Sequence, residues 1–273
     1  LFQARGRPGF GAEDQLERLL RQKKRQMWLI ASVMVVITVW SAWQTEFSFL
    51  AVFLGVEEIF RFVFTDFFPP DYSRFRHLIR PALDTICISF VAMVVGAVIS
   101  GFLAFFAAAT TCPFRLLQAG VRAFCSVLRN IPTLIWGILL VAAYGLGTFV
   151  GTLALIITAI GTLTRAYAEV LEEIDMGPVE AVRATGASYF QVLGQAVIPQ
   201  FMPGFIGWSL YKLELNVRAS TLIGMVGGGG LGFAIQNGLK LFRFSEVCLA
   251  ILMVITLIFV TEWMTSKLRE RIL

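Results

Sequence analysis

Residues 177–199 read GPVEAVRATGASYFQVLGQAVIP, and this polar segment interrupts a largely apolar second half of the chain. Gly177-Pro178 favours a helix start, because a proline at the first helical position lacks only a donor that would be unpaired there. The expected helix carries apolar side chains roughly on one side, at Val179, Val182, Phe190 and Leu193. Gly186 lies inside this pattern, where glycine costs about 1 kcal/mol relative to alanine. We therefore expect a bend or a close backbone approach at Gly186.

The composition explains the apolar runs on both sides of this segment. Of the 273 residues, 57% are hydrophobic and 15% are charged, and 25 are phenylalanine. A water-soluble fold of this size could not cover so much apolar surface, so the bilayer is the expected solvent. The net charge of +5 does not indicate nucleic acid, because Lys and Arg gather beside apolar runs and not on a polar domain.

Six stretches provide the roughly 20 mostly apolar residues that a membrane span needs. They are Met27–Thr45, Ala82–Ala109, Pro132–Gly147, Thr148–Tyr167, Phe201–Gly224 and Val247–Thr265. The third and fourth form one apolar run, in which Gly145, Gly147 and Gly151 mark a tight turn between two helices. The expected fold class is all-α, a polytopic membrane protein with six transmembrane helices.

The positions of Lys and Arg predict the orientation, since cytosolic loops carry an excess of both. Most of the 23 cations lie in the cytosol if both termini do. The opposite side then receives only Arg61, Arg74, Arg76, Arg80, Lys240 and Arg243. We expect a multi-pass protein with both termini in the cytosol.

The region before the second span divides into three parts. Residues 1–26 form a cytosolic amphipathic helix, with Leu16, Leu19 and Leu20 on one side and cations on the other. Such a helix either lies on the membrane face or is an ordinary solvated helix. Residues 27–45 form the first transmembrane helix, and residues 46–81 form an external segment folded against the spans.

Enzymatic and metal chemistry lack the residues that they need. The four cysteines, Cys87, Cys112, Cys125 and Cys248, show no CxxC spacing, so no disulfide or metal site is indicated. His77 is the only histidine, which leaves a zinc, haem or Ser-His-Asp centre without its usual ligands. We expect no catalytic residue and no metal or cofactor bound by this chain.

Charged residues lie near the middle of the fifth span, where each costs about 2.5 to 3.5 kcal/mol on insertion scales. Glu214 and Arg218 are four residues apart and can pair along the helix. Lys212 has no such partner and shares a stripe with Ser209, Asn216 and Ser220. It either forms a salt bridge to another helix or faces a wet cavity, where it would attract an anion.

A glycine-rich run follows the fifth span and formally contains GxGxxG at Gly227, Gly229 and Gly232. It is not a nucleotide site, because no strand precedes it and no Lys-Ser/Thr follows it. At the external end of the span it would form either a gate or re-entrant turn, or a helix break that allows close packing.

Two motifs resemble those of a known family. Glu180-Ala181-Val182, followed by Gly186 and then Ile198-Pro199, resembles the EAA loop in the permease subunits of bacterial ABC importers. Val182 occupies the third motif position, and Ala196 replaces the isoleucine of the distant Ile-x-Leu-Pro. Arg129-Asn130-Ile131-Pro132 is similar to a span entry of the same class.

A third stretch narrows the resemblance. Residues 211–221, YKLELNVRAST, together with Gly224 and residues 227–232, resemble the phosphonate permease branch, usually called PhnE. The likeness to the family covers about residues 84–273. It implies the type I ABC importer permease (MetI-like) fold, with a core domain of five transmembrane helices at residues 82–273 and an EAA coupling segment at residues 168–200.

The resemblance also implies partners and a function. The motif residues Glu180, Ala181, Val182, Gly186, Ile198 and Pro199 would dock on an ATPase that uses ATP and Mg. The assembly would contain a second copy of this chain, two ATP-binding cassette subunits, an extracytoplasmic substrate-binding protein and membrane lipid. The predicted function is ATP-driven import of phosphonate, or of a related small phosphorus oxyanion, across the bacterial inner membrane. The substrate pathway would include Lys212, Glu214, Asn216 and Arg218.

Other transport functions remain as alternatives. The chain could serve as the permease for another small solute, such as an amino acid or an osmolyte. An ATP-independent channel or secondary carrier is disfavoured, since many secondary carriers contain inverted repeats and none is visible in this sequence.

Overall fold

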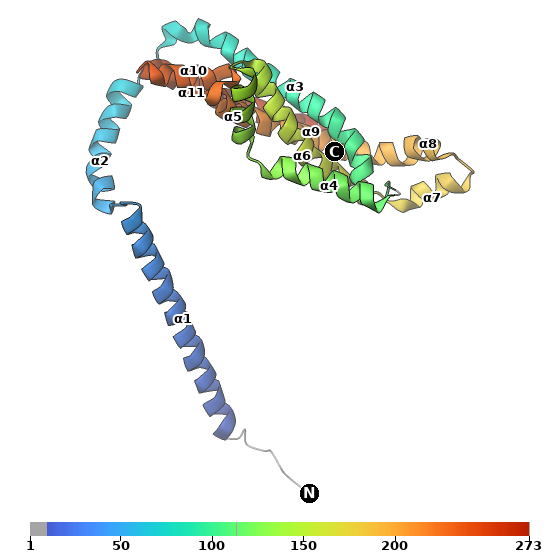
Figure 1. Ribbon diagram of the computed structural model, residues 1–273, viewed down its shortest axis with the longest axis horizontal. Coiled ribbons are helices and arrows are strands. Elements are labelled where there is room, and N and C mark those ends of the chain that lie inside the picture. Colours follow the sequence, from blue (N-terminus) through green and yellow to red (C-terminus); the bar gives the residue numbers. More distant parts are fainter. Residues whose placement is uncertain (1–9, 113, 273) are drawn as a thin grey trace. The chain divides into compact units, whose positions relative to one another are not determined.

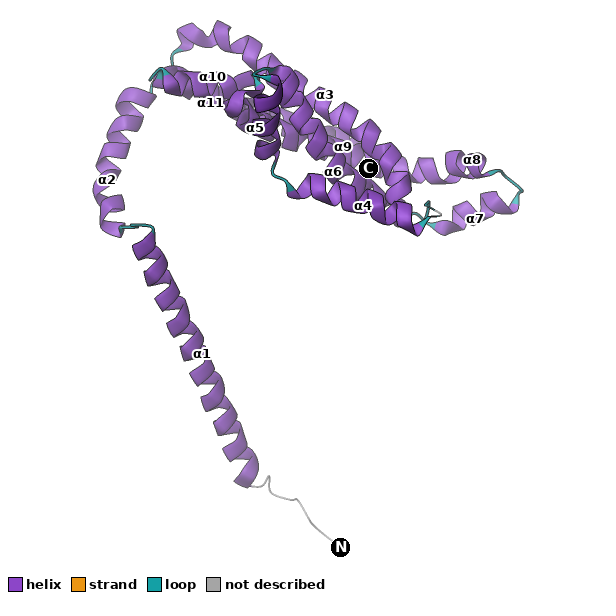
Figure 2. Ribbon diagram, in the orientation of Figure 1, coloured by secondary structure: helices purple, strands orange, loops and turns teal. Residues whose placement is uncertain are grey.

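The computed structural model describes the backbone of residues 10–112 and 114–272, and every regular element in this part of the chain is a helix (Figures 1 and 2). The contacts divide the chain into two units, Leu1–Phe62 and Val63–Leu273. The first unit contains α1 (Phe10–Gln44) and α2 (Phe49–Phe62).

Helix α1 is continuous where the sequence led us to expect two helices. No glycine, proline or capping residue interrupts the helix between residues 26 and 27, and the division there between a cytosolic part and a membrane-spanning part stays a prediction. Leu19–Gln44 is long and apolar enough to cross a membrane. Its apolar side chains, such as Met27 and Trp40, are exposed, as expected for a helix in contact with lipid. Residues 1–9 of the predicted amphipathic helix, and the side chain of Leu16, lie outside what the structure describes.

The second unit begins with a π-helical turn, η1 (Val63–Phe67), and a short 3-10 turn, η2 (Tyr72–Arg74). Both belong to the predicted external segment, and both contact the start of α11 (Phe244–Ile272). The Asp71 amide donates to the Ser245 carbonyl over 3.2 Å, and Arg74 lies 3.6 Å from Glu246. This part of the segment is therefore folded against a span, as predicted.

The remaining helices form the bundle drawn in Figure 1. They are α3 (Phe75–Ala107), α4 (Arg115–Asn130), α5 (Thr133–Tyr144), α6 (Thr148–Glu172), α7 (Met176–Ala184), α8 (Tyr189–Val192), α9 (Ile198–Ile223), α10 (Gly230–Lys240) and α11. Two further π-helical turns are η3 (Leu193–Val197) and η4 (Gly224–Gly228). Small residues let α3 and α6 approach closely, since a Cβ at Gly96 would overlap that of Ala159.

The predicted third span, Pro132–Gly147, is too short to cross a membrane alone. Its helix, α5, has 12 residues and would be about 18 Å long, against a hydrocarbon core of about 30 Å. The structure pairs α5 with α4 as one apolar unit bent by 85°. The bend follows from Pro132, because the residue before a proline, Ile131, is extended (φ −84°, ψ 120°). The predicted tight turn between α5 and α6 is confirmed: α5 ends at Tyr144, and α6 begins at Thr148.

The glycine run after α9 forms η4 and then α10, a helix that the sequence did not predict. The η4 and α10 elements fold back so closely that a Cβ at Gly232 would overlap the Thr221 carbonyl oxygen. The Leu231 amide also donates to the Thr85 hydroxyl of α3 over 2.9 Å. These contacts fit the expected helix break that allows close packing, whereas a gate role for Gly227, Gly229 and Gly232 stays a prediction.

Candidate functional site

The polar segment that follows α6 forms a helical hairpin of α7 and α8, which projects from one end of the second unit (Figure 1). Asp175 caps α7, because its carboxylate accepts from the Gly177 amide over 2.9 Å. Ser188 and Gln191 form a capping box that starts α8. Local side-chain chemistry therefore sets where both helices begin.

The turn between the two helices confirms the predicted bend at Gly186. This residue has φ +81°, a left-handed conformation that glycine adopts without the penalty of a Cβ. No atom lies within 4 Å of the position that a Cβ would take. Glycine is therefore required here by the backbone conformation and not by a close approach.

The base of the hairpin is fastened by Gln200, the third residue of α9. Its amide oxygen accepts from the Asp175 amide over 3.1 Å, and its amide nitrogen donates to the Asp175 carbonyl over 3.3 Å. The same nitrogen donates to the Ala196 carbonyl over 2.9 Å. The entry to α7 and the start of α9 are thus held together, and we call Asp175 and Gln200 the clasp.

The hairpin buries one face and exposes the other. Val179 and Val192 are buried and pack with Leu171 and Ala196 of the bundle. Phe190, expected on the same side as Val179, is 81% exposed. That expectation was wrong, because it assumed one helix through residues 178–197, whereas the chain breaks at the turn and α8 carries Phe190 outward.

The EAA-motif residues are divided between the exposed surface and the base of the hairpin. Glu180, Ala181 and Gly186 are exposed, and Val182 is half-buried. Ile198 and Pro199 begin α9 at the base. Sequence reasoning missed Tyr189, which lies beside Phe190 with ring centroids 5.8 Å apart and is 60% exposed.

The clasp was also missed, although its cap left a signal in the sequence. An aspartate directly before Met-Gly-Pro is a helix N-cap pattern. The amide of Gln200 left no comparable signal, because its partner lies 25 residues away in the chain.

Asp175→Ala is expected to loosen the hairpin without unfolding the bundle. Loss of an N-cap costs about 1 kcal/mol, which corresponds to about a five-fold rise in local opening. Limited trypsin cleavage after the exposed Arg183 should therefore be about five-fold faster than in the wild type. Asp175→Asn, an equally good cap, is the control. Equal cleavage rates in all three proteins would contradict the capping role.

Glu214 and Arg218 of α9 do not pair with each other, so that prediction was wrong. Glu214 binds Arg269 of α11 over 3.1 Å and accepts from the Thr265 hydroxyl. Arg218 binds Glu262 over 3.1 Å. Helix α11 supplies these partners from its C-terminal half, and the interhelical contacts replace the pair expected within α9. Both charges brace α9 against α11.

Lys212 lies on the opposite side of α9, inside the bundle. It is 7% exposed, and its ammonium is 3.4 Å from the Thr162 hydroxyl of α6. No carboxylate in the described part of the chain lies within ion-pair distance of Lys212. The salt bridge to another helix is therefore not formed among these residues, and the exposure of the ammonium to a wet cavity stays a prediction.

The predicted polar stripe of α9 lies against α3 and α6. Asn216 is fully buried and donates to the Ser89 carbonyl of α3 over 3.2 Å, while its side-chain oxygen has no partner among the described residues. Ser209 shares a hydrogen bond of 2.7 Å with the Tyr167 hydroxyl of α6. Among the described residues, the stripe therefore contains a cation without a carboxylate partner, Lys212, and a side-chain oxygen without a hydrogen bond, that of Asn216.

Residues 100–273 match the family described as binding-protein-dependent transport system inner membrane components. The chain belongs to this family. It is therefore a multi-pass permease subunit of the inner membrane, and the recognition from the EAA-like and PhnE-like motifs is confirmed.

Two relatives show which members of the family this permease resembles. It is 40% identical over 202 residues, which are 74% of each chain, to the phosphite transport system permease protein PtxC of Stutzerimonas stutzeri. It is 38% identical over 118 residues to the putative cryptic phosphonate transport system permease protein PhnE2 of Escherichia coli, covering 43% of this chain and 97% of that one.

Solved structures confirm the fold of the permease. A structure of the MetNI methionine ABC transporter in an inward-facing conformation matches with a TM-score of 0.65, over 74% of this chain and 99% of that one. The sequence identity is 21%, so the likeness concerns the fold alone. The predicted all-α, MetI-like permease fold is confirmed.

Proposed function

We propose that this permease imports a small phosphorus oxyanion, such as a phosphonate or phosphite, by alternating access driven by a partner ATPase. The permease itself binds no cofactor, and ATP and Mg are used by two ATP-binding cassette subunits. A second copy of the chain completes the pathway, and an extracytoplasmic binding protein delivers the anion. Both termini and the α7–α8 hairpin lie in the cytosol.

The observation that carries the proposal is the exposed aromatic end of the hairpin. Tyr189 and Phe190 lie side by side on α8, in the hairpin that projects from the bundle, and are 60% and 81% exposed. Exposed aromatic clusters on polar surfaces are typical of protein interfaces. Glu180, Ala181 and the Gly186 turn lie on the same hairpin. Together they form the proposed docking surface for the ATPase.

The nature of the cargo is supported by two independent features. The relatives in this branch are named as phosphite and phosphonate permeases. Lys212 supplies a buried cation without a carboxylate partner in the described part of the chain, and an oxyanion in transit would compensate it. Asn216, one turn further along α9, faces the same interior. Glu214 and Arg218 are already paired with α11 and serve as braces.

Uptake competition tests the cargo. Cells without their own phosphite and phosphonate uptake would express the permease with its ATPase and binding protein, and accumulation of labelled phosphite would be measured. Excess methylphosphonate should reduce accumulation, whereas methionine and glycine betaine should leave it unchanged. Cells that lack only the permease give the background. Competition by methionine or betaine, with none by phosphorus oxyanions, would contradict the proposal.

A further inference from the structure

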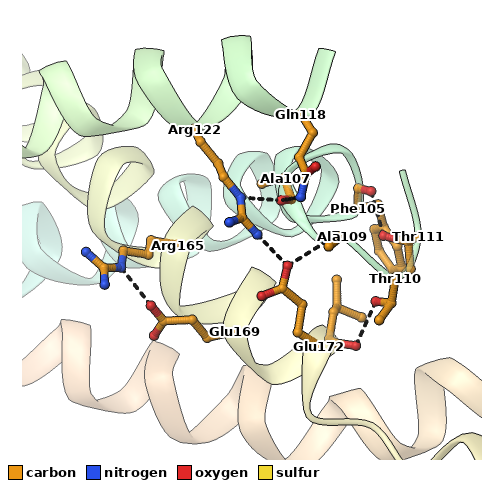
Figure 3. Close-up of polar contacts among 11 residues, drawn as sticks. Phe105, Ala107, Ala109, Thr110, Thr111, Gln118, Arg122, Arg165, Glu169 and Glu172 are labelled. Atoms are coloured by element: carbon orange, nitrogen blue, oxygen red, sulfur yellow. Dashed lines mark hydrogen bonds and ion pairs between the residues drawn. The ribbon is translucent and has the colours of Figure 1, made fainter. Parts of the chain in front are cut away.

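Glu172, the last residue of α6, ties that helix to two others (Figure 3). Its carboxylate accepts from the Ala109 amide, just beyond the end of α3, over 2.6 Å. The same oxygen accepts from the Arg122 guanidinium of α4. One carboxylate therefore joins the ends of α3 and α6 to the middle of α4.

Arg122 completes this connection from the other side. Its Nε donates over 2.7 Å to the carbonyl of Ala107, the last residue of α3. Such carbonyls lack partners within their own helix, and a cation there also interacts favourably with the helix dipole. Gln118 donates to the same carbonyl over 3.2 Å, and Thr110 donates to the Leu171 carbonyl over 3.1 Å. We call this set of contacts the Glu172 junction.

The junction lies directly before the hairpin in the chain. Asp175 of the clasp follows Glu172 by three residues, and α7 begins one residue later. Along the chain, a displacement of the hairpin base therefore reaches Glu172 before the rest of α6. Because Glu172 also holds α3 and α4, the same displacement reaches both helices.

The space beside the junction is not filled by side chains. A cavity of about 260 Å³ lies between α4 and α6 and borders Arg122, Gly161 and Glu172. This cavity is partly open and is lined by exposed side chains such as Arg122 and Arg165, so no packed side chain blocks a small shift of α4 relative to α6. Helix α4 is joined to α5 by the bent connection described above. A movement of α4 would therefore also affect the α4–α5 pair.

A second ion pair in the same region has a different geometry. Arg165 binds Glu169 over 2.7 Å, four residues along α6. Figure 3 shows that both residues belong to this one helix, whereas the Arg122 to Glu172 contact crosses between helices. The Arg165 to Glu169 pair thus offers a matched control with the same chemistry and no interhelical link.

We propose that Arg122 and Glu172 are positioning residues that transmit movement of the hairpin to α3 and α4. This role rests on the proposed ATP-driven transport, because the hairpin moves only if an ATPase docks on it. Both side chains remain partly exposed, so their contact can break and re-form without exposing a packed core.

The test compares transport with ATP hydrolysis in proteoliposomes that contain the permease, its ATPase subunits and the binding protein. In Arg122→Gln and Glu172→Ala, the anion transported per ATP hydrolysed should fall about five-fold, at the lower end of typical coupling between sites. The controls Arg165→Gln and Glu169→Ala should keep the wild-type ratio. The charge reversal Arg122→Glu with Glu172→Arg should not restore it, because a glutamate at position 122 cannot donate to the Ala107 carbonyl and an arginine at position 172 cannot accept from the Ala109 amide. A purely structural role would lower transport and hydrolysis together and leave the ratio unchanged.

Two results would overturn the role of the junction. One is a wild-type ratio in both Arg122→Gln and Glu172→Ala, and the other is an equal fall in the two control variants. The wild-type protein in the same assay separates this claim from the proposed function. ATP-driven uptake by the wild type, with unchanged ratios in the variants, overturns the junction alone, whereas wild-type uptake that is independent of ATP overturns both.

Discussion

Phe190→Asp is expected to release the ATPase subunits from the purified permease and to abolish ATP-driven uptake. Phe190 is the more exposed member of the Tyr189–Phe190 pair at the end of the hairpin, with 81% of its surface accessible. An aromatic anchor at the centre of an interface contributes about 2 kcal/mol or more, so its loss weakens binding about 30-fold. An aspartate in its place would also be desolvated without a partner.

Copurification in mild detergent measures this effect. The amount of ATPase retained per permease should fall to the level of an untagged control, while the permease keeps its thermal stability, because Phe190 packs on no core residue. Phe242→Asp is the matched control. Phe242 is 79% exposed, lies between α10 and α11, and has φ +54°, which aspartate tolerates. Full retention of the ATPase by Phe190→Asp would show that the hairpin end is not the docking surface.

Lys212→Met is expected to lower uptake at least about ten-fold without destabilising the permease. An intramembrane charge costs about 2.5 to 3.5 kcal/mol, and an anion in transit that offsets even half of this cost gains about ten-fold in binding. Methionine fills a similar space and carries no charge. Lys212 has no carboxylate partner in the described part of the chain, so removal of this buried cation should leave the melting temperature equal to that of the wild type or above it.

Uptake and thermal unfolding, measured on the same preparations, separate the two effects. Lys240→Met is the control, since Lys240 is an exposed lysine at the end of α10. Wild-type uptake by Lys212→Met would exclude a role in the pathway. A fall in uptake matched by a fall in melting temperature would instead show that Lys212 supports the bundle.

Local features of the fold could be predicted from the sequence, because glycine and proline act on their own backbone. The turn between α5 and α6 and the bend at Gly186 follow from glycines in left-handed conformations. Pro132 begins the predicted third span, and the structure shows that α4 ends two residues before it, at Asn130. The 85° angle that results was not predictable, because it depends on how α5 packs.

Interactions between helices could not be predicted from spacing alone. Glu214 and Arg218 satisfy the four-residue rule, yet each binds a residue of α11 more than 40 positions away. The rule describes isolated helices, and tertiary packing overrides it when another helix brings an opposite charge alongside. Lys212 shows the converse case, since burial against α6 leaves it without such a charge in the described part of the chain.

The hairpin shows why periodicity failed at Phe190. A single period of 3.6 residues places Phe190 with the buried valines only if the helix is unbroken. The Ser-x-x-Gln capping box at residues 188–191 marks a new helix start, and this signal competes with the continuous pattern. Attention to capping would have predicted two short helices and an exposed aromatic residue.

ATP-dependent accumulation in proteoliposomes tests the central claim most directly. The vesicles would contain the permease with its ATPase subunits, and labelled phosphite would be supplied outside with the binding protein. We predict accumulation above the external concentration with ATP inside, and none with a non-hydrolysable analogue or without the binding protein. Equal uptake without ATP, levelling at the external concentration, would contradict the claim and show a passive pathway.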